Sequence, residues 1–183
     1  MAEDGGGEPT VESKLVYQGD RIFAVRVHTV RLPSGRLTTR EIAEHSDSVC
    51  MVPLDSQGNV LLVRQYRKPV ESNLLEVPAG GIDENEDPEA AALRELQEEV
   101  GYTAGKISRL AGFWVSPGWC TEFMHAYLVT ELSPAQLDAD FDENITVVRV
   151  PLAETIDLIA SGEIQDAKSV ASLLLAMRHL RDN

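Results

Sequence analysis

The sequence predicts a mixed α/β sandwich, and three observations support this fold class. Short β-rich segments fill the first half of the chain, a helix with marked ends lies at about residues 87–101, and helical patterns return after residue 152. No internal repeat and no second core is visible in the sequence. A length of 183 residues therefore fits one ordinary domain with a small appendage.

Composition divides the chain into three parts. Residues 1–12 are Gly-rich, acidic and without periodicity, so we expect a disordered tail. Residues 13–46 contain β-rich runs around the turn Pro33-Ser34-Gly35, which predicts a small antiparallel β segment. Residues 47–183 form the main domain. A sheet as small as the N-terminal one rarely stands alone, so it must pack on the rest of the chain or on a partner.

In the main domain, apolar runs between turn residues predict the strands. SVCMVPLD and NVLLVRQYR flank the turn Ser56-Gln57-Gly58, and LLEVPAG leads into a loop. After the central helix, KISRLAGFWV, FMHAYLVTEL and ITVVRVPL have the same character. Helices are expected at about residues 152–160 and 166–180, the second with Asp166 as its N-cap. The apolar stripe of that last helix consists of Val170, Leu173, Leu174 and Met177.

The central helix has signals at both ends and an acidic face. Asp87 can cap its N-terminus, Pro88 occupies the first helical position, and Gly101 follows its end. At about 100° per residue, one face carries three glutamates: Glu95, Glu98 and Glu99. Their mutual repulsion weakens the helix, and a divalent cation would offset it. For such a run taken alone, a solvated acidic face is the alternative.

Composition also excludes several classes of protein. A formal net charge of −14 without a basic patch argues against a nucleic-acid partner. Two cysteines, Cys50 and Cys120, are too few for a disulfide framework, and four scattered histidines argue against a zinc site. No signal peptide is visible, and no apolar run is long enough to cross a bilayer. We therefore expect a cytoplasmic protein without a membrane partner.

The spacing around the central helix matches a known signature. Gly80 is followed after five residues by Glu86, and after seven more by the run RELQEEVGY at residues 94–102. This pattern resembles the signature of the Nudix hydrolases in every fixed position. The likeness extends over about residues 14–180 to the ADP-ribose pyrophosphatase branch. It includes REIAEH, QYR at residues 65–67, LLEVPAG, and SPG at residues 116–118.

This resemblance implies a fold, a reaction and a metal. Nudix domains are α/β/α sandwiches with a mixed sheet, here preceded by the small N-terminal antiparallel β segment. They hydrolyse a nucleoside diphosphate linked to another group, and this branch implies cleavage of ADP-ribose to AMP and ribose 5-phosphate. Mg²⁺, or alternatively Mn²⁺, with two or more ions per site, would counter the charge on the phosphoryl oxygens. By resemblance, the metal ligands are the Ala79 carbonyl, Glu95, Glu98 and Glu99.

Further roles follow from the same resemblance. Glu143, just before the strand that begins at Ile145, would be the base or an additional metal ligand, with Glu98 as the rival base. The substrate contacts would be Arg40, Glu41, Arg67, Pro117 and Glu122. Arg40 and Glu41 would complete the site of a second subunit. The resemblance therefore implies an intertwined homodimer with shared active sites.

Two signature residues would have supporting roles, and one segment departs from the family. Arg94 would orient the glutamates by salt bridges, and Glu86 would support the loop. After SPG the family usually has Phe or Tyr and then Ser-Asp-Glu, whereas residues 119–122 are WCTE, which retains only Glu122. This leaves open another nucleotide sugar, such as GDP-mannose. A non-catalytic nucleotide-sugar sensor is the alternative of another class, but such regulators usually lose a signature glutamate and none is missing here.

Overall fold

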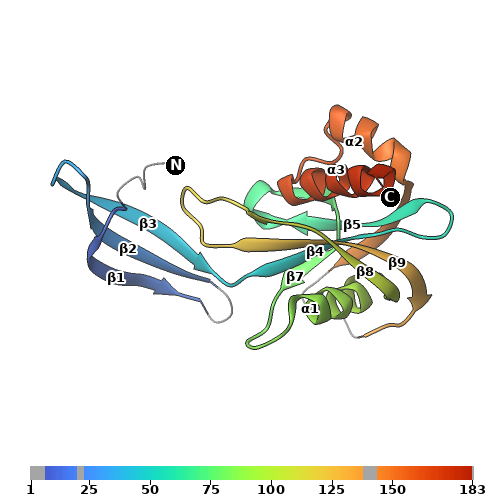
Figure 1. Cartoon of the computed structure of the whole chain (residues 1–183), viewed down its shortest axis with the longest axis horizontal. Helices are drawn as coiled ribbons and strands as arrows, with labels where there is room; N and C mark the ends of the chain where they lie inside the picture. The colour runs from blue at the N-terminus through green and yellow to red at the C-terminus, as the bar shows by residue number, and fades with distance from the viewer. Residues whose placement is uncertain (1–6, 20–22, 138–143, 183) are drawn as a thin grey trace. The chain divides into compact units, whose positions relative to one another are not determined.

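The computed structural model describes residues 7–19, 23–137 and 144–182, and the chain divides into two compact units (Figure 1). Unit 1 comprises Met1–Asp47 and Trp114–Phe123. Unit 2 comprises Ser48–Phe113 and Met124–Asn183.

Unit 1 is built on a three-stranded antiparallel sheet in the order β1-β2-β3. Its strands are β1 (Thr10–Gln18), β2 (Phe23–Arg31) and β3 (Leu37–His45). Gly35 lies in the turn between β2 and β3 with a φ of 81°, a conformation that glycine adopts without a steric penalty. The hairpin predicted at residues 33–35 is therefore confirmed.

The first strand starts earlier than the sequence predicts. Thr10 already pairs with Val30 of β2, so β1 begins within the segment 1–12 that was assigned to a tail. Thr10 and Val11 are β-branched and favour an extended backbone, which gives this stretch a reason to join the sheet. The segment Trp114–Phe123 of unit 1 also contacts β3, because the N–H of Ala43 in β3 donates to the Trp119 carbonyl at 2.8 Å.

Unit 2 is an α/β/α sandwich, as the sequence predicted. Its middle layer holds two sheets, β7-β4-β9-β8 and β10-β5-β6. The first sheet is mixed, since β4 pairs parallel with β9 and antiparallel with β7. The strands are β4 (Ser48–Pro53), β5 (Asn59–Arg67), β6 (Ser72–Glu76), β7 (Ala79–Gly81), β8 (Tyr102–Trp114), β9 (Phe123–Pro134) and β10 (Ile145–Pro151).

Helices cover both sides of this middle layer. In Figure 1, α2 and α3 lie on one side of the sheets and α1 lies on the other. The helical segments are η1 (Lys68–Val70), α1 (Pro88–Glu95), η2 (Leu96–Val100), η3 (Leu152–Glu154), α2 (Thr155–Ser161) and α3 (Ala167–Asp182). Within the described ranges, no helix has the length and apolar character that crossing a membrane requires.

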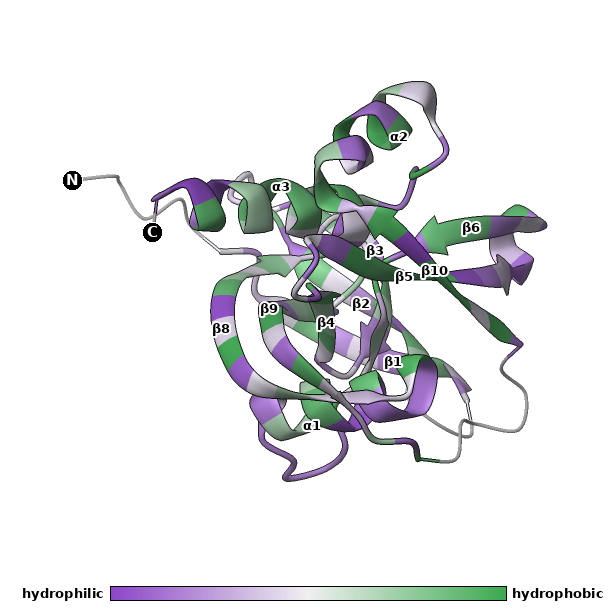
Figure 2. Ribbon diagram, turned by 90° about the vertical axis from the view of Figure 1, so that its right-hand side faces the viewer, coloured by the Kyte–Doolittle hydropathy of each residue, from purple (hydrophilic) through white to green (hydrophobic). Residues whose placement is uncertain are grey.

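Alternate residues of the central strands face two separate cores. In β4, Val49 and Met51 pack with α1, whereas Cys50 and Val52 pack with α3. This is the two-residue period of a strand, and burial of both faces explains why β4 reads as a continuous apolar run. In Figure 2 the ribbon of β4 is hydrophobic, while that of α3 alternates between hydrophobic and hydrophilic residues.

The last helix confirms one prediction and corrects another. Asp166 caps α3, since its Oδ2 accepts the Ser169 N–H at 3.0 Å. Leu173 is fully buried, but Leu174 is 45% exposed, so the predicted apolar stripe is wrong at that position. Leu174 is turned about 100° around the helix from Leu173. Ala176, three residues after Leu173, faces the core instead.

Candidate active site

The signature helix has the predicted ends but an unexpected second half. The Asp87 carboxylate accepts two backbone N–H groups of the first turn, Pro88 is the first helical residue, and Gly101 ends the segment with a φ of 78°. The regular α-helix, however, ends at Glu95. It continues as η2, a wide turn of the π type, and such single turns occur frequently at functional sites.

The wide turn separates the environments of the glutamates that the helical period placed on one face. Glu95 ends α1, whereas Glu98 and Glu99 lie in η2. Glu99 is almost fully buried, with 7% of its surface exposed. The side chain of Glu98 is 24% exposed. A uniform rotation of about 100° per residue therefore does not describe this acidic stretch.

Arg94 holds the acidic side chains together. Its guanidinium makes five hydrogen bonds, as many as it has N–H groups. Nε and Nη2 donate to the two oxygens of Glu86 at 2.9 and 2.8 Å, and Nη2 also donates to the Gly81 carbonyl. Nη1 donates to Glu95 at 2.7 Å and to Glu98 at 3.0 Å. The predicted salt bridges from Arg94 to the glutamates are thus present for Glu95 and Glu98.

Glu86 joins this arginine to the loop before the helix. The Asp83 N–H donates to Glu86 Oε2 at 3.0 Å, which confirms the supporting role predicted for Glu86. The hydrogen bonds from Arg94 lower the pKa of Glu86, although burial acts in the opposite direction. The hydrogen bond with Glu86 likewise raises the pKa of Arg94, against burial and together with Glu95. Both partners are thus fixed in their charged forms.

Gly80 allows Glu95 to lie directly against the backbone. A Cβ atom added at Gly80 would stand 2.0 Å from Cδ of Glu95, far closer than any real contact. A Cβ atom added at the neighbouring Gly81 would meet nothing within 4 Å. The position of the Glu95 carboxylate therefore requires a glycine at residue 80 but not at residue 81.

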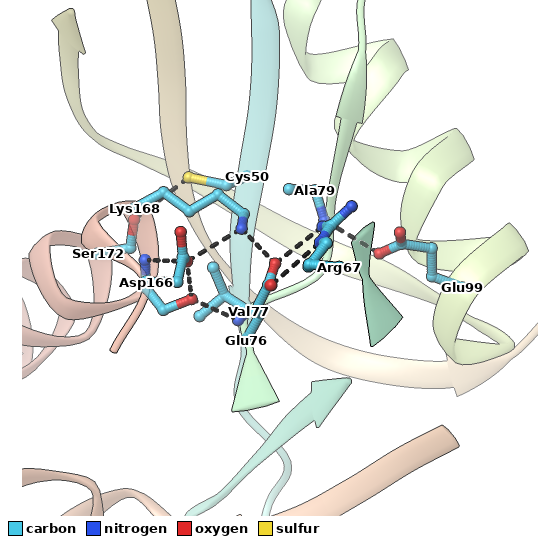
Figure 3. Close-up of polar contacts among 10 residues, drawn as sticks. Cys50, Arg67, Glu76, Val77, Ala79, Glu99, Asp166, Lys168 and Ser172 are labelled. Carbon is cyan, nitrogen blue, oxygen red and sulfur yellow. Dashed lines mark hydrogen bonds and ion pairs between the residues drawn. The ribbon is translucent and has the colours of Figure 1, made fainter. Parts of the chain in front are cut away.

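Glu99 is bound to the strand that opens the signature. Its Oε2 accepts the Ala79 N–H at 3.0 Å, and Ala79 is the first residue of β7 (Figure 3). The family resemblance implies that both residues are metal ligands, through the Ala79 carbonyl and the Glu99 carboxylate. The structure brings them together, with the N–H of Ala79 as the contacting group.

The chemistry of these donors fits a hard divalent cation. Glu95, Glu98 and Glu99 offer only carboxylate oxygens, which are the ligands that Mg²⁺ and Mn²⁺ prefer. Among the described residues, no three His, Cys, Asp or Glu side chains converge into a preformed metal site. The reason is that Glu95 and Glu98 turn toward Arg94, while Glu99 accepts the Ala79 N–H.

Arg67, the predicted phosphate contact at the end of β5, is oriented by a buried carboxylate. Its Nε and Nη2 donate to the two oxygens of Glu76 at 3.1 and 2.8 Å. The Glu76 side chain is 2% exposed and that of Arg67 is 38% exposed. Nη1 of Arg67 makes no hydrogen bond with any described residue. Hydrogen bonding to Glu76 raises the pKa of Arg67, against burial and with a further contribution from Glu99.

The other four predicted substrate contacts all lie in unit 1. Arg40 and Glu41 lie on β3, and Pro117 and Glu122 lie in the segment Trp114–Phe123. Arg40 forms a two-pronged ion pair with Glu8, with distances of 2.7 and 3.0 Å. Both side chains of that pair are exposed. Glu143, the predicted base, lies outside the described residues.

No role was predicted from the sequence for Glu76 or for Lys168, which contacts it. The signal for Glu76 was available, because it is a carboxylate inside the apolar run LLEVPAG. A charged residue in such a run is seldom buried unless it is paired. Lys168 had no comparable signal, since lysine is common on the surface of helices.

Comparison with known proteins extends over both units. The model of the NUDIX domain matches residues 44–173, and the model of the nucleoside diphosphate sugar hydrolase N-terminal domain matches residues 8–42. The ADP-ribose pyrophosphatase of Bacillus subtilis (strain 168) is 36% identical over 91% of this chain and 90% of its own. The GDP-mannose pyrophosphatase of Yersinia pestis (strain Pestoides F) is 37% identical over 67% of this chain and 66% of its own. The crystal structure of an ADP compounds hydrolase superposes with a TM-score of 0.88 at 27% identity, covering 97% of this chain and 96% of that one.

Proposed function

This chain belongs to the Nudix hydrolase family, and from that premise we propose that it splits ADP-ribose into AMP and ribose 5-phosphate. The observation that carries the proposal is the excess of carboxylate around one arginine. Arg94 binds Glu86, Glu95 and Glu98, and Glu99 lies in the same wide turn. Such an excess of negative charge near a phosphate-binding site calls for divalent cations.

We assign separate roles in the reaction to the carboxylates and to the arginines. Glu95, Glu98, Glu99 and the Ala79 carbonyl would hold two or more Mg²⁺ or Mn²⁺ ions, which supply counter-charge for the phosphoryl oxygens. Arg94 keeps the carboxylates in position, and Arg67 presents its guanidinium to a phosphate. Glu98 accepts the proton of the attacking water, or Glu143 does so from beyond the described residues.

The extent of the similarity supports ADP-ribose over GDP-mannose as the substrate. The relative named ADP-ribose pyrophosphatase matches 91% of this chain, whereas the relative named GDP-mannose pyrophosphatase matches 67%. The two compounds differ in the base and also in the sugar beyond the second phosphate. We assign recognition of this sugar to Arg40, Glu41, Pro117 and Glu122, all of which lie in unit 1.

We also infer a homodimer with shared active sites, formed through residues 13–46, while residues 47–183 form the hydrolase domain. Strand β1 is exposed along its whole length, including Val11, Leu15, Val16 and Tyr17. An exposed edge strand with large apolar side chains favours pairing with another chain. Sedimentation is expected to give twice the chain mass of 20.1 kDa, and a monomer at micromolar concentration would refute the inference.

A cytoplasmic location completes the proposal. Cys50 and Cys120 form no disulfide, in keeping with a reducing compartment. Separation of cytoplasmic and membrane fractions from the source cells, probed with an antibody against the chain, is expected to recover it in the cytoplasmic fraction.

Release of AMP from ADP-ribose tests the proposed reaction. The parent should release AMP with Mg²⁺ and not after its removal, and Glu99→Gln should lower kcat/KM by about 10³-fold, or about 4 kcal/mol of transition-state stabilisation. Glu98→Gln should lower it as well. Glu163→Gln is the matched control, because Glu163 lies between α2 and α3 and forms an exposed ion pair with Arg64.

Two outcomes of these measurements would contradict the proposed function. Equal activity of the parent, Glu98→Gln and Glu99→Gln would remove the catalytic assignment. Binding of ADP-ribose without release of AMP would make the chain a sensor. Running GDP-mannose beside ADP-ribose and identifying the products decides between the two nucleotide sugars.

A further inference from the structure

A hydrogen-bonded network joins Arg67 to the start of α3. Glu76, which binds Arg67, also accepts a hydrogen bond from Lys168 Nζ. Lys168 Nζ donates in addition to Asp166 Oδ2 at 2.9 Å. The Lys168 side chain is only 12% exposed, and Figure 3 shows its amine between the two carboxylates. The network therefore alternates in charge from one end to the other.

This alternation keeps a buried carboxylate ionised. Burial alone would raise the pKa of Glu76, but the hydrogen bonds from Arg67 and Lys168 outweigh burial and lower it. A buried charge that loses one partner is strongly destabilised unless others compensate it. Lys168 and Arg67 both donate to Glu76, so the negative charge of this carboxylate is balanced by two cations and neutralises Arg67 less completely.

The same network reaches the backbone that leads to the acidic site. Asp166 Oδ2 accepts hydrogen bonds from both the N–H and the hydroxyl of Ser169. Ser169 Oγ in turn accepts the Val77 N–H at 2.8 Å. Val77 stands two residues before Ala79, whose N–H binds Glu99. The start of α3 thus binds Glu76, which orients Arg67, and the backbone of Val77, two residues before the strand that contacts Glu99.

We propose that Lys168 is a positioning residue for pyrophosphate hydrolysis, acting through Glu76 to set how the Arg67 guanidinium meets a substrate phosphate. The proposal rests on the proposed function. Glu76 occupies Nε and one N–H of Nη2, which fixes the plane of the guanidinium. The remaining N–H groups of Arg67 can then bind phosphate oxygens. Lys168 lessens the neutralisation of Arg67 by Glu76, so more of its positive charge acts on the substrate.

Removal of the charge at residue 168 tests the proposal. Lys168→Met should raise the KM for ADP-ribose about tenfold, the effect of weakening one charge-assisted hydrogen bond. It should change kcat by less than about threefold, because the glutamates of the acidic site are untouched. Lys168→Gln removes the same charge with a smaller change in packing and should give the same rise. Lys168→Arg keeps the charge and should restore the parent KM.

The matched control lies on the same helix. Arg178→Met also removes one positive charge from α3, but Arg178 is 73% exposed and pairs with Asp182. Its KM should equal that of the parent. A rise in KM of the same size in Arg178→Met would mean that the rise in Lys168→Met comes from the net charge of the helix. The positioning role would then be overturned.

A double-mutant cycle shows whether Lys168 acts through Arg67. In an Arg67→Ala background, Lys168→Met should produce no further rise in KM, because the group that it positions is gone. If the two effects multiply instead, the positioning role is wrong. An unchanged KM in both Lys168→Met and Lys168→Gln would overturn it as well.

Affinity for ADP, measured by calorimetry, separates failure of this proposal from failure of the proposed function. A parent that binds ADP but releases no AMP from any nucleotide sugar refutes the function. In that case, weaker ADP binding by about tenfold in Lys168→Met still supports the positioning role. Equal ADP binding by the parent and Lys168→Met overturns the positioning role whether or not the chain is a hydrolase.

Discussion

Two charged clusters in unit 2 use the same kinds of residue but balance their charges differently. In the Arg94 cluster, formed by Glu86, Arg94, Glu95 and Glu98, one guanidinium serves three carboxylates. In the Glu76 cluster, formed by Arg67, Glu76, Asp166 and Lys168, two cations serve two carboxylates. The first cluster keeps an excess of negative charge, whereas the second is neutral.

This difference separates a cluster that supports the structure from one that needs a ligand. Burial of a balanced cluster costs desolvation, but each charge in it has a partner of opposite sign. In the Arg94 cluster, Glu95 and Glu98 share the single Nη1 group of Arg94, so their repulsion is only partly offset. Proteins commonly accept such a loss of stability where function requires it.

Removing one carboxylate from each cluster gives the largest expected effect. Glu76→Gln leaves the Arg67 and Lys168 cations without their shared carboxylate and should lower the free energy of unfolding by about 3 kcal/mol. Glu98→Gln removes a carboxylate from a cluster that has too many. In the absence of divalent metal it should change that free energy by less than about 0.5 kcal/mol.

Urea unfolding with a chelator present measures both values, provided that the dependence on urea concentration stays the same in each variant. Equal losses for Glu76→Gln and Glu98→Gln would contradict the distinction between the clusters. A large loss for Glu98→Gln alone would reverse it, and would mean that the acidic face is structural.

The two neighbouring glycines of the signature provide a sharper test of the Arg94 cluster. Gly80→Ala must displace the Glu95 carboxylate, since the new Cβ atom would stand 2.0 Å from its Cδ. A displacement of about 1 Å at a reacting centre can lower activity about 10²-fold, and we expect a fall of that order in kcat/KM. Gly81→Ala meets no atom within 4 Å and is the matched control, with an expected change below about threefold. Equal effects of the two substitutions on AMP release would show that the placement of Glu95 is not critical.

The sequence predicted those parts of the molecule that depend on local signals. Gly35 lies in the hairpin turn between β2 and β3, Gly58 lies in the turn between β4 and β5, and both have a positive φ. Asp87 caps the signature helix as expected. The burial of every residue of β4 also follows from its uninterrupted apolar run. Each of these features is decided by residues a few positions apart, which is the range over which turn and capping rules act.

Features that depend on tertiary contacts were not accessible in the same way. The bond between Glu76 and Lys168 joins residues 92 positions apart, and no local pattern encodes it. The wide turn η2 departs from the helical period on which the common face of the glutamates was based. Leu174 was misassigned because the stripe of α3 is narrower than periodicity alone suggested. The ion pair of Arg94 with Glu86 was not predicted, because the resemblance gave these two residues separate roles.

The smallest expected effect is a change in stability at acid pH. It concerns Glu86, the carboxylate to which Arg94 makes two hydrogen bonds. Hydrogen bonding to Arg94 lowers the pKa of Glu86, against burial, so the folded state holds its proton less tightly than the unfolded chain. Its contribution to stability is therefore complete above the ordinary glutamate pKa of about 4.3 and is lost as the pH falls through the depressed value.

The stability difference between the parent and Glu86→Gln should accordingly be about 1 kcal/mol near neutral pH and should shrink toward zero as the pH falls below about 4. Urea unfolding of both proteins from neutral to acid pH measures this difference. Glu163→Gln is the control, since the exposed pair of Glu163 with Arg64 is worth little at any pH. A difference that grows on acidification would mean that Glu86 is not held as an anion by Arg94, and the Arg94 cluster would then carry less negative charge than its geometry implies.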